Sequence, residues 1–392
     1  MKKLFVTGIT GLVGSAFVVE LLRQRSDYSL VCLVRHGGGR TAEERAEAII
    51  RDECRFDGCP EIAGKVLAAM TVIDGDVVTL DPEALAKDPR LAGVTEVFHC
   101  AADVNLGKDP TGKTFRINYE GTKNIIRLAQ LLKVSAFHYV GTAYVAGKLL
   151  GTAMEDNPVD NGFNNPYEES KFKAEMLVRN SGIPFSVYRP AIVTGRRSDG
   201  RIRKPLAFYR VLEFLGKMKS HTCSKAGVDP RNWIDIGLNF TTQPSEHVYF
   251  VPIDYVQKAV TALFQKPVRN QAYHITGDSP VTTRQIEDTI CRILRLDGVS
   301  VEAHKQLETQ DDRLMGRFLG DLFPYFSGDI KFDQTNVRRE LGDEILDWEY
   351  GVKGLDTLIR AFYHDYFPGV EWIQELASTQ PDREPHRAGA KI

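Results

Sequence analysis

The stretch "KKLFVTGITGLVG" (residues 2–14) decides the fold class, because three evenly spaced glycines directly follow an apolar run. The run at 2–8 is typical of a buried strand, and a helical pattern follows near 14–25. Backbone N–H groups at a helix N-terminus can bind a pyrophosphate, and glycines permit the tight turn and close approach. We predict a dinucleotide-binding loop, with a purely structural strand–helix turn as the alternative. Its candidate cofactor-binding residues are Thr7, Gly8, Thr10, Gly11, Leu12, Val13 and Gly14.

Apolar runs and helical patterns alternate over the first half of the chain. The expected strands are 2–8, 29–35, 70–76, 96–102, 136–142 and 185–191, and the expected helices lie near 14–25, 41–55, 114–133 and 166–180. Strands that are apolar on both faces belong to a parallel sheet covered by helices. The sequence therefore predicts an α/β fold, a Rossmann-type doubly wound parallel sheet.

The character of the sequence changes after about residue 195, where "GRRSDGRIRKP" is basic and rich in turn residues. We expect a Rossmann domain with the catalytic residues at 1–195 and a smaller, mainly helical substrate lobe at 196–380. A strand near 272–277 is expected to return to the sheet, so the lobe is interleaved with it. The polar tail 381–392 is predicted to be disordered.

Bulk composition excludes several classes of function. The formal net charge of −2 gives no global attraction to nucleic acid or to a membrane surface. No apolar run approaches the roughly 20 residues that span a bilayer. The six cysteines form no CxxC pair, which favours reduced thiols, a cytoplasmic location and no metal site. Composition leaves the oligomeric state open.

The end of the second expected strand indicates which dinucleotide is bound. An NAD site usually has an acid there that binds the ribose 2′-hydroxyl, but this strand ends in "LVRH" with Arg35. An arginine suits a 2′-phosphate, so NADP (as NADPH) is favoured over NAD, although Arg35 is also compatible with an ordinary solvated strand end. Asp76 and Val77, at the end of the third expected strand, are candidate cofactor-binding residues. Asp76 is either a partner of the adenine amino group or a helix N-cap.

The segment "NNPYEESKFKAEMLVRNSG" (164–182) places Tyr167 four residues before Lys171 on an expected helix. Asn165 is a good N-cap and Pro166 suits the first helical position. Positions i and i+4 share a helix face, so the phenol and the ammonium are expected to meet there. A nearby cation would lower the phenol pKa from about 10. The alternative is an exposed Tyr–Lys pair on a solvated helix.

Four motifs in order resemble the extended short-chain dehydrogenase/reductase superfamily. They are "TGITGLVG" (7–14), "HCAADV" (99–104), "YVGTAYVAG" (139–147) and "YEESK" (167–171). The resemblance implies a catalytic set of Thr142, Tyr167 and Lys171, with Asn118 in "INYEGT" as the fourth member. It also implies cofactor contacts at Tyr167, Lys171, Cys100, Ala101, Ala102, Pro190, Ala191, Ile192 and Val193.

Further segments are most similar to thioester reductases, which include terminal reductase domains of peptide and polyketide synthases, carboxylic acid reductases and fatty acyl-CoA reductases. These segments are "CLVRH" (32–36), "YRPAIVTGRRSDGR" (188–201) and "VYFVPIDYV" (248–256). The resemblance implies NADPH-dependent reduction of an acyl thioester to an aldehyde, with a second hydride giving an alcohol. We expect the thioester to come from a separate, acidic acyl or peptidyl carrier protein or from coenzyme A.

Two further segments and two competing functions stay open at this point. The basic residues of 196–204 either dock a carrier protein or form a solvated loop, and the aromatic-rich stretch 321–332 either packs in the core or lines a substrate channel. The competing enzymes on this fold are sugar-nucleotide epimerases or dehydratases and hydroxysteroid-type carbonyl reductases. A non-catalytic dinucleotide sensor is the other class.

Overall fold

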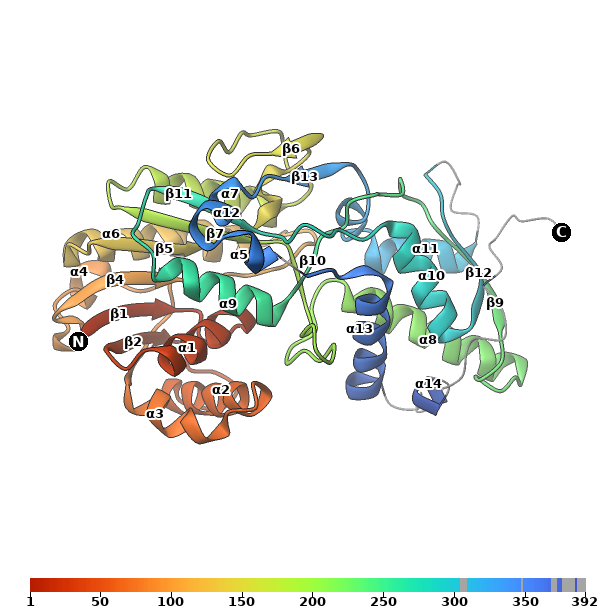
Figure 1. The fold of residues 1–392 in the computed structure, drawn as a ribbon, viewed down its shortest axis with the longest axis horizontal. Coiled ribbons are helices and arrows are strands. Elements are labelled where there is room, and N and C mark those ends of the chain that lie inside the picture. The colour runs from red at the N-terminus through yellow and green to blue at the C-terminus, as the bar shows by residue number, and fades with distance from the viewer. Residues whose placement is uncertain (304–308, 347, 368–371, 376–384, 386–392) are drawn as a thin grey trace. The chain divides into compact units, whose positions relative to one another are not determined.

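The computed structural model describes the chain except for residues 304–308, 347, 368–371, 376–384 and 386–392 (Figure 1). It contains two compact units. The first unit consists of Met1–Ala191, Tyr255–Thr276 and Phe332–Ile345, and the second of Ile192–Asp254, Gly277–Lys331 and Leu346–Ile392. The sequence places the boundary between the two parts at residue 195, and the structure places it at residue 191. Residues 255–276 and 332–345 belong to the first unit, although the sequence analysis assigned them to the lobe. The predicted disordered tail lies outside the described residues apart from Pro385.

A seven-stranded sheet of parallel neighbours forms the centre of the first unit, in the order β11–β7–β5–β4–β1–β2–β3. Its strands are β1 (Lys2–Thr7), β2 (Tyr28–Val34), β3 (Met70–Asp74), β4 (Val94–His99), β5 (Ala136–Val140), β7 (Phe185–Pro190) and β11 (Gln271–Ile275). The predicted fold class is confirmed. Register aligns Thr7 with Leu33 of β2 and His99 of β4, so the carboxyl ends of these strands meet at one edge.

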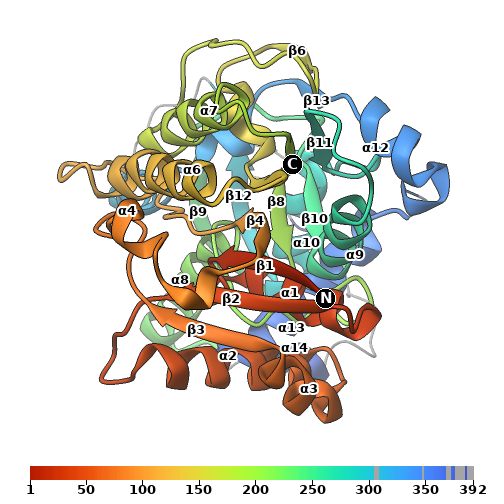
Figure 2. The same cartoon turned by 90° about the vertical axis from the view of Figure 1, so that its left-hand side faces the viewer.

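Helices cover both faces of this sheet (Figure 2). On one face, α1 (Leu12–Gln24) and α9 (Ile253–Phe264) bury an aromatic group in which Phe17 stacks on Phe98 with centroids 3.7 Å apart. On the other face, α6 (Gly121–Leu132) and α7 (Pro166–Arg179) bury the main aliphatic core. The other elements of this unit are α2 (Ala42–Phe56), η1 (Pro60–Ile62), α3 (Ala63–Ala68), α4 (Pro82–Leu85), η2 (Pro89–Leu91), α5 (Lys113–Phe115), η3 (Arg116–Glu120), η4 (Ala143–Ala146), β6 (Gly151–Ala153) and α12 (Thr335–Leu341).

The helix expected over 114–133 is divided into three pieces. The short α5 is followed by η3, a π-helical turn that contains Asn118, and only then by the regular α6. A π-turn inserts one extra residue per turn and is frequent at functional sites. Here it turns the Asn118 side chain towards α7, as the contacts below show.

Within the first unit, a buried carboxylate connects α12 to β11. Glu155 accepts hydrogen bonds from the backbone N–H groups of His274 (2.7 Å) and Asn336 (2.5 Å). Burial raises the pKa of Glu155 to about 8. The contact joins chain segments more than a hundred residues apart, and sequence periodicity does not reveal it.

The second unit is built mainly from helices and two parallel strand pairs, β8 with β10 and β9 with β12. Its helix α10 packs against α13 and β12. The remaining elements of this unit are β8 (Ile192–Thr194), α8 (Tyr209–Ala226), β9 (Ile234–Phe240), β10 (Phe250–Pro252), α10 (Thr283–Leu294), β12 (Leu296–Val301), α11 (Gln310–Leu319), η5 (Phe323–Tyr325), α13 (Gly351–Tyr366) and α14 (Trp372–Glu375). Two elements, β13 (Ile330–Phe332) and η6 (Asp343–Leu346), include the residues at which the chain passes from one unit to the other.

Candidate functional site

The glycine loop between β1 and α1 is tightly packed. Gly8 has a φ of +81°, and a Cβ built on it would lie 2.5 Å from the backbone nitrogen of Ala101. A Cβ on Gly14 would lie 2.2 Å from the carbonyl oxygen of Gly8. The N–H of Gly11 closes the turn by donating to that same oxygen at 2.9 Å. Side chains at Gly8 and Gly14 are therefore excluded by backbone atoms.

This loop fits a pyrophosphate. Gly11 is the N-cap of α1 and provides no side-chain cap, so the helix begins at Leu12 with its first N–H groups directed at the loop. Such an end carries partial positive charge and binds anions. The structure places the predicted residues of this group at the end of β1, in the loop and in the first turn of α1, namely Thr7, Gly8, Thr10, Gly11, Leu12, Val13 and Gly14.

A buried hydrogen-bond chain connects β1, β4 and η3. The Thr7 hydroxyl lies 2.7 Å from Nδ1 of His99, and His99 Nε2 lies 3.0 Å from the Thr122 hydroxyl. Thr122 donates to the carbonyl of Asn118 at 2.6 Å, so it accepts from His99, which must carry its proton on Nε2. Burial lowers the pKa of His99 to about 3, so the ring is neutral. Sequence analysis did not identify His99, although it lies within the "HCAADV" motif.

The same chain of hydrogen bonds positions the residues that follow β4. The Thr7 hydroxyl accepts from the N–H groups of Cys100 (3.3 Å) and Ala101 (3.2 Å). Cys100 is half-buried, and burial raises the pKa of its thiol to about 11, against the opposing effect of the Lys171 charge. Of the predicted trio, Cys100 and Ala101 therefore lie beside the glycine loop and Cys100 lies near the Lys171 charge, whereas Ala102 follows them in the chain.

Basic and acidic side chains alternate at the ends of β2 and β3. The exposed Arg35 guanidinium lies 3.1 Å from the Asp76 carboxylate, which also accepts from the N–H of Val78 at 2.8 Å. Next to them, the ring of His36 lies 2.9 Å from Asp74. Asp76 thus caps a turn and pairs with Arg35. Val77 is buried, and its side chain would collide with a Cβ at Gly121.

Tyr167 and Thr142 come together at the carboxyl end of β5. Asn165 caps α7 by accepting from the N–H of Glu168 at 3.0 Å, which places Tyr167 in the first turn as predicted. The Thr142 hydroxyl accepts from the N–H of Tyr144 at 3.3 Å, and the Thr142 side chain acts on the Tyr167 phenol. Burial raises the pKa of Tyr167 to about 12, against the opposing effect of the Thr142 side chain. The phenol is therefore protonated at neutral pH.

The expected effect of Lys171 on the phenol pKa is not found, because the net shift is upwards. The Lys171 ammonium donates to the carbonyl of Val140 at 2.7 Å and lies 4.3 Å from the centre of the Tyr139 ring. Burial lowers the pKa of Lys171 to about 8. The reason is geometric: α7 packs its Lys171 face on β5, and the ammonium reaches a strand carbonyl.

Asn118 connects three parts of the site. Its side-chain amide accepts from the N–H of Asp103 (2.8 Å) and donates to the carbonyl of Asp103 (3.0 Å) and to the hydroxyl of Ser170 (2.9 Å). Ser170 in turn donates to the carbonyl of Tyr167 at 2.8 Å. Ser170 and Asp103 were not singled out from the sequence; only the contact with Asn118 identifies them.

The four residues at the end of β7 and after it that were predicted to contact the cofactor belong to different units. Pro190 ends β7 and accepts from the Thr142 hydroxyl at 3.4 Å, and the N–H of Ala191 donates to Ile275 of β11 at 3.2 Å. Ile192 and Val193 belong to β8 of the second unit.

Three arginines that follow β8 are paired with acids of the second unit. Arg196 pairs with Asp199, Arg201 with Asp365 and Arg210 with Asp321. Arg197 and Lys204 are exposed. Within the described ranges, the structure contains no group of three His, Cys, Asp or Glu side chains that could hold a metal ion, and none of its helices has the length and apolarity to cross a membrane.

The chain is similar to several characterised proteins. A family described as "Male sterility protein", an NAD-binding domain, matches residues 6–260. The non-canonical nonribosomal peptide synthetase FrzA of Cladobotryum sp is 26% identical over 308 residues, covering 75% of this chain and 28% of the relative. The carboxylic acid reductase of Mycobacterium marinum is 26% identical over 289 residues, covering 67% of this chain and 23% of the relative.

Among solved structures, the terminal R domain of the myxalamid PKS-NRPS biosynthetic pathway superimposes with a TM-score of 0.69 at 21% identity, covering 93% of this chain and 91% of that one. This likeness establishes the fold. The chain spans about a quarter of the length of the two curated relatives described above.

Proposed function

Because the chain belongs to the male sterility protein family of NAD-binding domains, we propose that it is an NADPH-dependent reductase that releases an acyl thioester as an aldehyde. The observation that carries this proposal is the pair of buried residues Tyr167 and Thr142 at the end of β5, where the Thr142 side chain acts on the phenol. Both hydroxyls lie at the sheet edge where ligands bind in doubly wound folds.

A carbonyl at this position would need a proton as hydride arrives. The nicotinamide cofactor, when bound, supplies the hydride to the thioester carbonyl carbon. Tyr167, protonated at neutral pH, donates its proton to the oxygen, and Thr142 donates a hydrogen bond where negative charge develops. The resulting hemithioacetal breaks its C–S bond, so that the sulfur leaves as a thiol with the hydroxyl proton and the carbon becomes an aldehyde.

Lys171 and Asn118 are proposed to position this pair. Lys171 fixes α7 on β5 through Val140, and its remaining ammonium protons can bind the ribose hydroxyls of the cofactor. Asn118 fixes Asp103 and, through Ser170, the backbone of Tyr167. Either residue would act on turnover through the placement of the phenol.

The preference for NADPH is proposed from the basic end of β2. Arg35 is exposed, and its partner Asp76 also caps a turn, so the guanidinium can turn to a 2′-phosphate without leaving a buried acid unpaired. Guanidinium–phosphate contacts are among the stronger hydrogen bonds in proteins. A 2′-hydroxyl would offer Arg35 no comparable partner.

The proposed partner is a carrier protein or coenzyme A that presents the thioester, in the cytoplasm, where the six free thiols would persist. Arg197 and Lys204 are better candidates for docking an acidic carrier than Arg201, because Arg201 is paired with Asp365. A charge-reversal test at Arg201 would break that pair as well as any docking contact. Reversal at Arg197 or Lys204 avoids this ambiguity, and an unchanged KM for a carrier-bound substrate would exclude docking there.

The experiment that tests the proposed function measures oxidation of NADPH and, separately, of NADH by the purified chain. The substrates are acyl-CoA and acyl-pantetheine thioesters and the matching aldehydes. NADPH consumption with release of one thiol per aldehyde formed is the expected result. Turnover of ketones or aldehydes alone would replace the proposal with a carbonyl reductase, and tightly bound NAD without turnover would replace it with an epimerase or dehydratase.

A further inference from the structure

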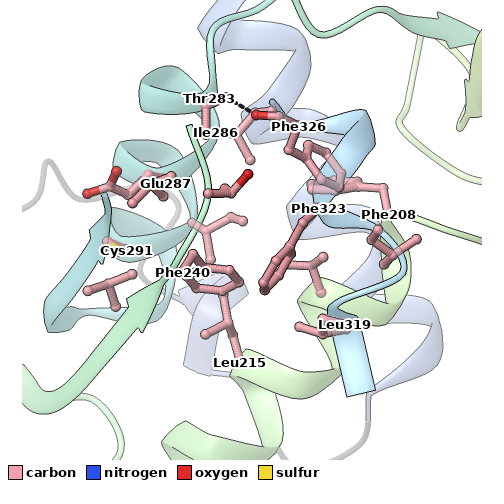
Figure 3. A pocket seen from close by; sticks show the side chains of 16 residues that line it. Phe208, Leu215, Phe240, Thr283, Ile286, Glu287, Cys291, Leu319, Phe323 and Phe326 are labelled. Atoms are coloured by element: carbon pink, nitrogen blue, oxygen red, sulfur yellow. Dashed lines mark hydrogen bonds between the residues drawn. The ribbon is translucent and has the colours of Figure 1, made fainter. Parts of the chain in front are cut away.

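The second unit contains a small apolar pocket within its own fold (Figure 3). Leu322, Phe323 and Phe326 of the aromatic-rich stretch 321–332 contribute to its wall. Its cavity volume is about 50 Å³. At roughly 10–15 Å³ for each water-sized sphere, it could hold a few water molecules, so its size does not indicate a site for a larger ligand.

A buried histidine at the end of β4 is more informative. His99 is fully buried, yet both of its ring nitrogens have partners. Nδ1 lies 2.7 Å from the Thr7 hydroxyl of β1, and Nε2 lies 3.0 Å from the Thr122 hydroxyl of α6. Burial of an imidazole has a desolvation cost that an apolar ring of similar shape avoids. Hydrogen bonds on both sides therefore indicate that this ring connects β1 to α6 and does more than fill space.

On the β1 side, His99 determines the direction of the Thr7 hydroxyl. Because the ring carries its proton on Nε2, Nδ1 accepts and Thr7 donates. The lone pairs of the Thr7 oxygen are then available to the N–H groups of Cys100 (3.3 Å) and Ala101 (3.2 Å). A Cβ built on Gly8 would lie 2.5 Å from the nitrogen of Ala101. The ring thus supports the backbone on which the glycine loop packs.

On the α6 side, the same ring begins the support of the catalytic tyrosine. Thr122 accepts from His99 and donates to the carbonyl of Asn118 at 2.6 Å. The Asn118 amide donates to Ser170 at 2.9 Å, and Ser170 donates to the carbonyl of Tyr167 at 2.8 Å. A continuous series of buried residues therefore extends from β1, through His99, to the first turn of α7.

We propose that His99 is a positioning residue that holds the glycine loop and Tyr167 in a fixed position relative to each other. The inference rests on the reductase function proposed above and adds to it a residue outside the predicted catalytic set. His99 acts through Thr7 on one side and through Thr122 on the other. With the proton on Nδ1 instead, Thr7 would accept from the ring, and one of the two N–H groups that it binds would lose its acceptor.

Two substitutions distinguish positioning from the filling of space. His99→Phe keeps a ring of similar shape but removes both hydrogen bonds, so it should weaken NADPH binding and lower kcat, each by about tenfold. His99→Gln offers an amide oxygen to Thr7 and an amide N–H to Thr122, so it should recover most of both losses. Quenching of intrinsic fluorescence gives NADPH affinity, and NADPH oxidation with an acyl thioester gives kcat.

The matched control is His138→Phe on the neighbouring strand β5. His138 is also buried, and its Nδ1 lies 2.8 Å from the hydroxyl of Tyr188. Its ring lies against Phe264 of α9, with centroids 4.5 Å apart, and α9 covers the opposite face of the sheet from α6. The same substitution here should lower the urea midpoint but leave NADPH affinity and kcat unchanged.

A double-mutant cycle tests whether His99 acts on the tyrosine through Ser170. Ser170→Ala removes the last link before Tyr167 and should lower kcat by itself. If His99→Phe acts along the same series, the combined loss should be smaller than the product of the two single losses, because one link is already broken. His138→Phe combined with Ser170→Ala should give the loss of Ser170→Ala alone.

The outcomes separate this inference from the proposed function. If no thioester is reduced, the proposed function fails, and a loss of NADPH affinity in His99→Phe that His99→Gln restores still supports the role of His99. If thioesters are reduced and His99→Phe matches His138→Phe in both NADPH affinity and kcat, the inference is overturned.

Two further results would also overturn it. The first is a combined loss in the cycle equal to the full product, because His99 would then act independently of Tyr167. The second applies if His99→Phe does not fold. Thr122→Val then replaces it, since valine has the shape of threonine without the hydroxyl, and an unchanged kcat in Thr122→Val contradicts the inference.

Discussion

Gly14→Ala tests whether the glycine loop is as tightly constrained as its geometry indicates. The added Cβ would lie 2.2 Å from the oxygen and 2.8 Å from the carbon of the Gly8 carbonyl, whereas unbonded carbon and oxygen atoms prefer about 3.5–4 Å. Both contacts are to backbone, so no side-chain rotation relieves them. The start of α1 must therefore move away from β1 by about 1 Å or more.

The expected cost is about 3 kcal/mol, at the upper end of overpacking penalties. Displacement of the first turn of α1 should also weaken NADPH binding by at least about tenfold, because its N–H groups no longer converge on the pyrophosphate. The matched control is Gly64→Ala in α3, where a Cβ would have no neighbour within 4 Å. That change should stabilise the chain by about 0.5–1 kcal/mol, since alanine is the better helix former.

Urea unfolding gives the stability of both variants, and quenching of intrinsic fluorescence gives NADPH affinity. The two glycine-to-alanine changes should move the urea midpoint in opposite directions. If Gly14→Ala matches Gly64→Ala in midpoint and binds NADPH like the parent chain, the reasoning from the Gly8 contact is refuted.

Three further changes test the catalytic and cofactor assignments. Tyr167→Phe should lower kcat on the order of 10²- to 10⁴-fold and leave NADPH affinity unchanged, because it removes only the proton donor; unchanged turnover would exclude Tyr167 as the acid. Arg35→Ser should weaken NADPH binding by about tenfold or more without affecting NADH, as titration of each cofactor would show, and an equal loss for both would argue against 2′-phosphate binding. Lys171→Met addresses pH: the folded-state pKa of Lys171 is about 8, below the usual value of 10.5, so the native state binds fewer protons between these pH values and its stability rises with pH. Urea unfolding across this window should show a rise smaller by about 2–3 kcal/mol in Lys171→Met than in the parent chain, and equal slopes would contradict the depressed pKa.

The sequence predicted the parts of the site that depend on local spacing. The glycine loop and the α7 N-terminus follow from residues within a few positions of one another, and the structure has both. The partners of Lys171 and Asn118 could not be predicted in this way. Val140 lies 31 residues from Lys171, and Ser170 lies 52 residues from Asn118. Such contacts depend on how α7 and η3 pack, and periodicity carries no information about that.

Of the segments that line the pocket of the second unit, the sequence singled out only the stretch 321–332, and only as an alternative to core packing. Its lining extends from Phe208 to Phe326, and each segment alone resembles ordinary core. The expected lowering of the Tyr167 pKa failed because a helical i, i+4 pair was treated as isolated. Burial raises the pKa of the phenol, and the Lys171 ammonium is directed to the carbonyl of Val140. Only the packed structure shows how deeply both groups are buried.

The way the chain passes between its two units limits how this protein can be engineered. It crosses from one unit to the other after residues 191, 254, 276, 331 and 345. A chimera that exchanged everything beyond residue 195 would also remove β11 from the edge of the sheet, along with α12, which Glu155 attaches to it. Transplanting substrate preference from a relative therefore requires the exchange of three separate segments with matched junctions, and the first two of them must each return the chain to the first unit.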